Sequence, residues 1–191
     1  MKVGIAGYGV VGKTRHRSIV ANTSYQVTAI SESNEHARKS IPADSIVFND
    51  YKSLIANAEI DIIFISLPNQ FAAEATSLSL KKGLHVFCEK PPARTYHELL
   101  AVQNEALKFP ELKLMYGFNH RFHLSVEEAK SIIKGNSLGQ IINMKGVYGK
   151  SQMISFNQTD WRTNREASGG GILLDQGIHM LDLMRYLSGE N

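Results

Sequence analysis

Short apolar runs alternate with stretches of helical periodicity through the first two thirds of the chain, and this alternation restricts the fold more than any other feature. Strands are expected at residues 2–6, 27–30, 61–66, 84–88 and 113–116, and helices at residues 13–21, 71–82 and 96–107. Strands that are almost continuously apolar are typical of parallel sheets covered by helices on both faces. The sequence therefore predicts an α/β fold with a doubly wound parallel sheet.

The pattern changes after Gly117. A helix is expected at residues 125–134, a strand at 140–148, a polar stretch through residue 164, and then a glycine-rich entry into a last helix that ends near residue 187. We therefore predict two domains, an α/β domain of residues 1–118 and the beginning of an α+β second domain, residues 119–191.

Composition excludes several classes of partner. The 21 Lys and Arg residues exceed the 18 Asp and Glu residues by only 3, and no basic stripe is present, so a nucleic-acid partner is not expected. The longest apolar run, residues 60–65, falls far short of the roughly 20 residues of a membrane helix, and the start does not resemble a signal peptide. Cys88 is the only cysteine, which excludes an internal disulfide. We expect a cytoplasmic protein with neither membrane nor metal.

Three glycines with the spacing Gly7-x-Gly9-x-x-Gly12 directly follow the first expected strand and precede the first expected helix. In this context the first glycine permits a tight turn, the second lets the backbone approach a diphosphate, and the third lets helix and strand pack closely. Backbone amides at the helix start, here at Val10 and Val11, would then face the anion. The motif predicts a dinucleotide site.

An acidic residue stands where such a site needs one. Glu32 lies 20 positions after Gly12, just past the second expected strand, where a carboxylate accepts from the ribose 2′-hydroxyl of the adenosine. The next residue is Ser33 rather than an arginine that could receive a 2′-phosphate. The cofactor prediction is therefore NAD in preference to NADP.

The same turn also fits a phosphate-binding loop of nucleotide hydrolases, since Lys13 and Thr14 follow Gly12. Those enzymes need a second carboxylate at the end of an apolar strand to hold magnesium. Here the corresponding strands run into Ser31 and Ser66. Dinucleotide binding is favoured over the hydrolase alternative.

Two further clusters are candidates for chemistry. Lys90 follows the expected strand at 84–88, at the sheet edge where α/β proteins bind ligands, although spacing alone favours a surface charge. Asp175 and His179 are four residues apart on the last expected helix and could form an orienting pair or an ordinary polar surface. A helical wheel places one polar and one apolar stripe on opposite faces, with the apolar stripe buried. The polar stripe consists of Asp175, His179, Asp182 and Tyr186, and the apolar stripe of Leu173, Met180, Met184 and Leu187.

Taken together, these motifs resemble the Gfo/Idh/MocA oxidoreductase family. The resemblance runs from the glycine turn through Glu89-Lys90-Pro91 to residues 169–182, and so covers essentially the whole chain. It implies a Rossmann cofactor domain, followed by a domain that brings Asp175 and His179 beside the nicotinamide. It also implies further cofactor contacts from Ser66, Pro68, Asn69, Glu89, Lys90, Trp161 and Arg162.

The resemblance further implies reversible oxidation of a secondary alcohol. His179, with an ordinary pKa near 6.5, would act as general base, Asp175 would orient its ring, and Lys90 would stabilise the alkoxide. The expected substrate is a sugar or polyol bound by Lys90, Asp175 and His179. Arg121 resembles an arginine near the substrate in relatives that act on nucleotide sugars, and inositol-like polyols are the rival.

Two features depart from the family pattern. Ala72 stands where relatives often carry a histidine, and relatives continue well past residue 191. The length raises the alternative of a cofactor-binding remnant or fragment without turnover. A homo-oligomer is expected if the sheet of the second domain is completed.

Overall fold

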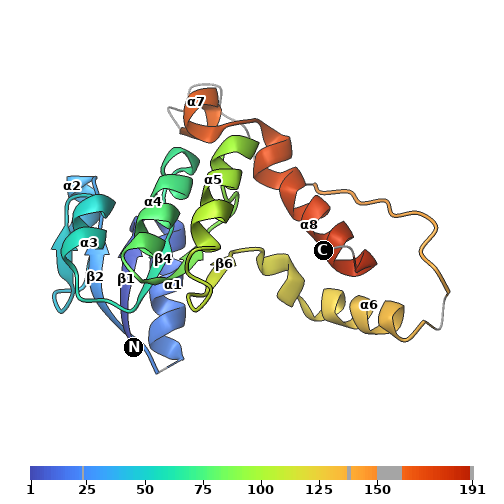
Figure 1. Ribbon diagram of the computed structural model, residues 1–191, viewed down its shortest axis with the longest axis horizontal. Helices are drawn as coiled ribbons and strands as arrows, with labels where there is room; N and C mark the ends of the chain where they lie inside the picture. Colours follow the sequence, from blue (N-terminus) through green and yellow to red (C-terminus); the bar gives the residue numbers. More distant parts are fainter. Residues whose placement is uncertain (23, 137–138, 150–160, 190–191) are drawn as a thin grey trace.

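The computed structural model describes residues 1–22, 24–136, 139–149 and 161–189 (Figure 1). Its strands are β1 (Lys2–Ala6), β2 (Gln26–Ser31), β3 (Ile46–Phe48), β4 (Ile62–Ile65), β5 (His85–Cys88) and β6 (Leu114–Tyr116). Its α-helices are α1 (Val10–Ala21), α2 (Glu35–Arg38), α3 (Tyr51–Asn57), α4 (Asn69–Lys81), α5 (Tyr96–Ala106), α6 (Leu124–Lys134), α7 (Arg165–Ser168) and α8 (Ile178–Ser188). Shorter turns are the 3₁₀ helices η1 (Asn119–Phe122) and η2 (Trp161–Thr163), and the π-helical turn η3 (Leu173–Gly177). No helix within these described ranges is long and apolar enough to cross a membrane.

The six strands form one parallel sheet in the order β3-β2-β1-β4-β5-β6. This is the strand order of the Rossmann fold, and it confirms the predicted doubly wound sheet. Strands β2 and β3 are added on one side of β1 and strands β4 to β6 on the other, so the strand order reverses between β1 and β4. Ligands of open α/β sheets bind at this switch point, beyond the carboxyl ends of the strands.

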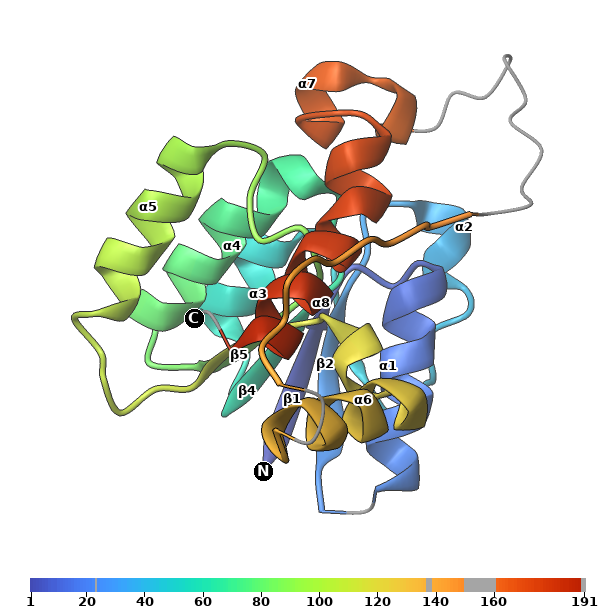
Figure 2. The same ribbon diagram turned by 90° about the vertical axis from the view of Figure 1, so that its right-hand side faces the viewer.

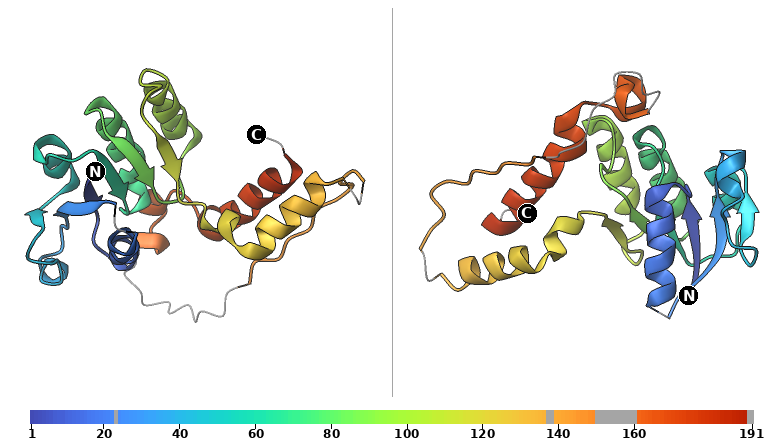
Figure 3. Two further views of the ribbon diagram at one scale, coloured as in Figure 1. Left: turned by 90° about the horizontal axis from the view of Figure 1, so that it is seen from below. Right: turned by 180° about the vertical axis from the view of Figure 1, so that it is seen from behind.

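Two apolar cores lie on opposite faces of the sheet. Alternate residues of β1 belong to each core: Val3 and Ile5 pack with Ile19 of α1, whereas Ala6 packs with Leu54 of α3 and with α4. Helices α3, α4 and α5 cover one face and α1 the other, as the views from below and behind show (Figure 3). Burial of both faces explains why the strands are so uniformly apolar.

The region between β2 and β4 contains three elements that the sequence pattern did not predict. The strand β3 has only three residues and lies at the sheet edge, and its Ile46 and Val47 are exposed, so it lacks the buried apolar run of the other strands. The helix α2 has a single turn. A signal for α3 was present, because Asp50 is a good N-cap residue, and its carboxylate accepts from the Ser53 amide at 2.8 Å.

The strand predicted at residues 140–148 is wrong. This segment belongs to no sheet, because no strand in the described parts of the chain lies beside it. It runs alongside α8 instead (Figure 2), and a Cβ on Gly146 would lie only 1.9 Å from Met180 Cε. Of the polar stretch predicted through residue 164, residues 150–160 lie outside the described residues.

Candidate functional site

A cavity of about 740 Å³ lies at the carboxyl ends of the central strands, a volume typical of small-molecule sites. The residues predicted from the sequence that line this cavity are Gly7, Gly9, Val10, Val11, Glu32, Ser66, Pro68, Asn69, Glu89, Lys90, Trp161, Arg162 and Asp175. The lining residues that sequence reasoning missed are Ser31, Ser33, Asp50, Tyr51, Lys52, Leu67, Phe71 and Glu74. Gly12, Arg121 and His179 do not line it.

The glycine turn has the geometry that its spacing predicts. Gly7 has a φ of +87°, which favours glycine. A Cβ on Gly12 would lie 2.1 Å from the Gly7 carbonyl oxygen, so this glycine allows α1 to approach the turn. A Cβ on Gly9 would meet nothing within 4 Å, so the space next to its backbone is open.

The start of α1 can accept an anion. Its N-cap, Gly9, has no side chain to bond the first amides, and no acidic residue lies in the first turn. The positive end of the helix dipole and the amides at Val10 and Val11 therefore face the cavity without a counter-charge from their own helix. This arrangement fits the diphosphate of a dinucleotide.

Glu32 lies directly after β2 and contacts the backbone of the glycine turn. Its Oε2 accepts from the Tyr8 amide at 2.9 Å, and its Oε1 accepts from the Asn34 amide at 2.9 Å. Arg38 lies nearby, but its Nη1 donates to the Glu32 carbonyl oxygen and to Asn49 Oδ1. The carboxylate is held at the cavity wall, where the sequence placed a ribose contact.

The two residues that suggested a hydrolase loop point elsewhere. Thr14 Oγ1 donates to the Val10 carbonyl oxygen within α1. The Lys13 ammonium lies 5.9 Å from the centre of the Tyr8 ring, and neither residue lines the cavity. The geometry therefore lacks the lysine and hydroxyl contacts on which the hydrolase alternative depends.

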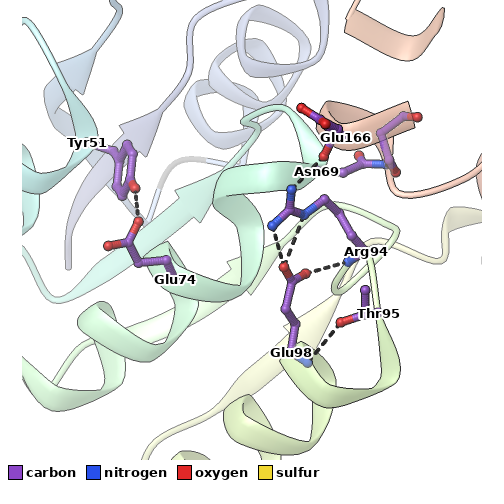
Figure 4. Close-up of polar contacts among 8 residues, drawn as sticks. Tyr51, Asn69, Glu74, Arg94, Thr95, Glu98 and Glu166 are labelled. Carbon is purple, nitrogen blue, oxygen red and sulfur yellow. Dashed lines mark hydrogen bonds and ion pairs between the residues drawn. The ribbon is translucent and has the colours of Figure 1, made fainter. Parts of the chain in front are cut away.

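The side of the cavity formed by α3 and α4 carries a polar cluster that sequence reasoning missed. The Tyr51 hydroxyl donates to Glu74 Oε2 at 2.5 Å (Figure 4). Lys52 Nζ pairs with Glu74 Oε1 at 2.6 Å. Burial, followed by the hydrogen bond to Glu74, raises the pKa of Tyr51 above its usual range. No motif marked these residues: Tyr51 and Lys52 lie on α3, which was not predicted, and Glu74 lies on the predicted helix α4 without a spacing that indicates a site.

At the other end of the cavity Lys90 and Asp175 form a pair. Lys90 Nζ donates to Asp175 Oδ1 at 2.9 Å and to the Asp175 carbonyl oxygen at 2.6 Å. Burial acts to raise the pKa of Asp175, but the hydrogen bond and charge of Lys90 outweigh it, and the pKa is lowered. An ammonium group has three N–H donors, and the described residues accept from two directions, so the third is available for a ligand.

His179 differs from expectation in two respects. The Asp175 carboxylate bonds Lys90 and Gln176, whereas His179 Nδ1 is buried and has no hydrogen-bond partner among the described residues. No hydrogen bond from Asp175 orients this ring. Burial lowers the pKa of His179 to about 4, and the charges of His120 and Lys90 act in the same direction. The pKa of His179 therefore lies well below the ordinary value near 6.5.

The predicted orientation of the last helix is also wrong. On the predicted polar stripe His179 is only 6% exposed and the Asp182 side chain only 8%. On the predicted apolar stripe Leu173 is 80% exposed, whereas Met180, Met184 and Leu187 are half-buried. The wheel assumed a regular α-helix from residue 173, but the π-helical turn η3 changes the phase of Leu173 relative to α8. Within α8 itself the wheel was wrong about which face is buried. The polar stripe faces inward, toward η1 and Lys90.

Arg121, predicted to contact substrate, lies outside the cavity. It forms a bidentate ion pair with Asp182 of α8, with Nε 2.8 Å from Oδ2. Its guanidinium also lies 5.0 Å from the centre of the Tyr186 ring. The pair joins η1 to α8.

A clamp of three cross-links, defined here as Lys90–Asp175, Arg94–Glu166 and Asn69–Ser168, holds the segment before α8. Arg94 Nη1 donates to the Glu166 carbonyl oxygen at 2.5 Å, while its other nitrogens bind Glu98 of α5 (Figure 4). Asn69 Nδ2 donates to the Ser168 carbonyl oxygen at 2.8 Å, and Asn69 also lines the cavity.

Cys88 ends β5, two residues before Lys90, and is fully buried. Burial raises the pKa of its thiol to about 12. The thiol is therefore unreactive in the folded protein.

Comparison with known proteins agrees with this geometry. Residues 1–118 match the family described as "Oxidoreductase family, NAD-binding Rossmann fold", and residues 126–191 match the "GFO/IDH/MocA C-terminal domain". The chain belongs to the Gfo/Idh/MocA oxidoreductase family. The predicted family resemblance is confirmed.

Among curated relatives in the Gfo/Idh/MocA family, D-glucoside 3-dehydrogenase of Escherichia coli is 30% identical over 99% of this chain and 54% of its own length. Levoglucosan dehydrogenase of Pseudarthrobacter phenanthrenivorans is 31% identical over 100% of this chain and 52% of its own length. The chain therefore spans about half the length of these relatives.

Solved structures of the Gfo/Idh/MocA family superimpose closely. Levoglucosan dehydrogenase in complex with NADH and levoglucosan matches with a TM-score of 0.89 at 28% identity, over 99% of this chain and 54% of that one. Myo-inositol 2-dehydrogenase from Lactobacillus plantarum matches with a TM-score of 0.86 at 28% identity, over 99% and 56%.

Proposed function

We propose that this chain is the cofactor-binding and catalytic part of an NAD-dependent dehydrogenase that oxidises a secondary hydroxyl of a sugar or polyol. One observation carries the proposal: a single cavity joins the glycine turn at Gly9 to the Lys90–Asp175 pair. A dinucleotide whose diphosphate lies at the turn would extend along this cavity toward the pair. The relatives that act on glucosides and levoglucosan support this substrate class.

NAD supplies a hydride acceptor when bound. The chain's own residues would hold its diphosphate at the Val10 and Val11 amides and its adenosine ribose at Glu32. The buried Ser66 hydroxyl lines the cavity and has no hydrogen-bond partner among the described residues, so it is suited to bond the bound ligand. A 2′-phosphate would meet the Glu32 carboxylate, which favours NAD over NADP.

In the proposed reaction the substrate carbon loses its hydrogen as a hydride and the hydroxyl loses its proton, leaving a carbonyl. The remaining N–H of Lys90 would stabilise the developing alkoxide, and Asp175 would hold the ammonium in place. His179, neutral at pH 7, would accept the proton. Its low pKa makes it a weak base in the ligand-free protein.

Arg121 bears on the choice between sugars. Because its guanidinium is committed to Asp182, it is not directed at a nucleotide phosphate. We therefore propose an unphosphorylated sugar or polyol rather than a nucleotide sugar.

Energy transfer from the single tryptophan, Trp161, to NADH tests cofactor binding, because Trp161 lines the cavity. We expect saturable transfer with NADH, loss of transfer but not of binding in Trp161→Phe, and turnover of NAD with glucosides, levoglucosan or inositols.

His179→Ala should lower kcat by at least about 100-fold. Full turnover by His179→Ala would refute its role as base, and absence of binding by the folded chain would refute the whole proposal.

Glu32→Ser tests the choice of cofactor. The variant should bind NAD about tenfold more weakly, and it should lose its discrimination against NADP, because the ribose contact and the repulsion are removed together. Tighter binding of NADP than of NAD by the wild-type chain would contradict the preference.

A cofactor-binding unit without turnover is the second candidate, favoured by the fraction of the relatives that the chain spans. Saturable NADH binding without turnover of any sugar would support it. We also propose that the two domains meet near residue 118, and that completion of the second domain's sheet produces a homo-oligomer.

A further inference from the structure

His179 packs face to face against a second histidine. The centres of the His120 and His179 rings are 4.2 Å apart, and the ring planes differ by 15°. Tyr148 lies nearly parallel to both rings, at 5.5 Å from His120 and 6.2 Å from His179. Phe118 meets His179 edge-on at 6.2 Å. His179 is therefore enclosed by rings on several sides.

The elements that carry these rings are firmly connected. His120 lies in η1, and its neighbour Arg121 is tied to Asp182 on the same helix as His179. The turn into η1 is held at Gly117, where a Cβ would lie 2.6 Å from Glu89 Oε2. The position of His120 is consequently set by α8 and by the loop that bears Lys90.

The charges around the stack disfavour a protonated His179. Among the described residues, the nearby basic groups are Lys90 in the loop after β5, His120 in η1 and His123 directly after η1, and the nearby acids are Asp175 and Asp182. Each acid already has a cation, Asp175 with Lys90 and Asp182 with Arg121. A proton added to His179 would thus bring a positive charge that no acid near the stack, among the residues that the structure describes, is left to balance.

We propose that His120 is a positioning residue for His179, fixing the plane of its ring and keeping it uncharged so that it can take a proton from substrate. This role deepens the proposed function, since it assumes that His179 is the base. Without His120, His179 would lose both the ring that covers one face and the neighbour whose charge opposes its own.

Nitrogen-15 NMR titration of the 191-residue chain labelled at its seven histidines tests this role without requiring catalysis. His179→Gln identifies the His179 signals. In the wild-type chain the midpoint of His179 should lie near pH 4. His120→Phe keeps a flat ring but removes the charge, and it should raise the midpoint of His179 by roughly one unit.

His120→Ala removes ring and charge together, so it should raise the midpoint further and broaden or shift the His179 signals, because the ring gains freedom. His97→Ala, on the exposed face of α5, is the matched control and should leave the His179 midpoint unchanged. An unchanged midpoint in His120→Phe and His120→Ala, with native spectra elsewhere, would overturn the proposal. Its failure is distinct from failure of the base role, which the turnover of His179→Ala decides.

Discussion

At the scale of single residues, the burial of His179 links protons to stability. Its pKa is about 4 in the folded chain, against an ordinary value of 6.5 in the unfolded chain. Between these two values the unfolded state binds more protons than the folded state. The free energy of unfolding must therefore fall as pH decreases through this window, by up to about 1.4 kcal/mol per pH unit for one such group.

His179→Gln removes this group, because glutamine does not titrate. We expect urea unfolding of the variant to lose less stability than wild type between pH 6.5 and pH 4, while His120 and His16, whose pKa values are also lowered by burial, keep part of the slope. His97→Gln serves as the exposed control. Equal slopes for wild type and His179→Gln would show that His179 is protonated in the folded chain at these pH values.

Residues whose role is steric were predictable, whereas the partners of polar side chains were not. The spacing predicted the turn at Gly7 and the close packing at Gly12, because each depends on the absence of a Cβ at one point of a local turn. The approach of a diphosphate at Gly9 stays a prediction. The partner of Asp175 is Lys90, 85 positions away in the sequence. Such a contact depends on how distant elements meet, and helical spacing suggested the wrong partner, His179.

At the scale of elements, the start of α1 offers a test that separates ligand binding from folding. A Cβ at Gly9 meets nothing within 4 Å, and the residue has a φ of −71°, which alanine accepts. Gly9→Ala should therefore keep the wild-type unfolding midpoint but weaken NADH binding at least about tenfold, because the methyl group enters the space before the α1 amides.

Gly135→Ala is the matched control for Gly9→Ala, since its Cβ would make only ordinary contacts and its φ is −68°. It should alter neither folding nor binding. NADH affinity that is unchanged in Gly9→Ala would place the diphosphate elsewhere.

The clamp predicts how the segment before α8 behaves when one cross-link is lost. Arg94→Ala breaks the contact with Glu166, so amide hydrogen exchange of residues 166–175 should accelerate by roughly tenfold, the equivalent of about 1.4 kcal/mol. Arg94→Lys keeps the charge but loses the fork-shaped guanidinium, and should give an intermediate rate. Arg17→Ala, whose partner Thr14 lies in its own helix, should exchange like wild type.

Equal exchange in Arg94→Ala and wild type would mean that Lys90 and Asn69 hold this segment without help.

The fold of the elements was largely predictable where apolar runs were long, as in β1 and β4. It was not predictable at β3, where three residues at a sheet edge carry too little apolar pattern. The strand expected at 140–148 failed because a strand needs a neighbour, which its own sequence cannot supply.

At the scale of the whole molecule, large apolar side chains remain exposed on η3 and α8. Leu173 and Leu181 are mostly exposed, whereas Leu54 is completely buried in the core between the sheet and α3. Leu173→Gln and Leu181→Gln should therefore change the free energy of unfolding by no more than about 0.5 kcal/mol. Leu54→Ala should cost about 2–5 kcal/mol.

Urea unfolding at several protein concentrations measures these differences. A loss above about 1 kcal/mol in Leu181→Gln that grows with concentration would show that another copy covers this face in solution.

Because Cys88 is buried, its rate of labelling by a thiol reagent measures how often the surrounding structure opens. Cys88 carries the only thiol of the sequence and lies where β5 leads into the Glu89–Lys90 loop, so a maleimide can reach it only when that part of the sheet opens. The rate of labelling consequently reports opening of the sheet at the end of β5, beside the cavity. Any small molecule that binds in the cavity should lower the labelling rate of Cys88, whether or not it is converted to product.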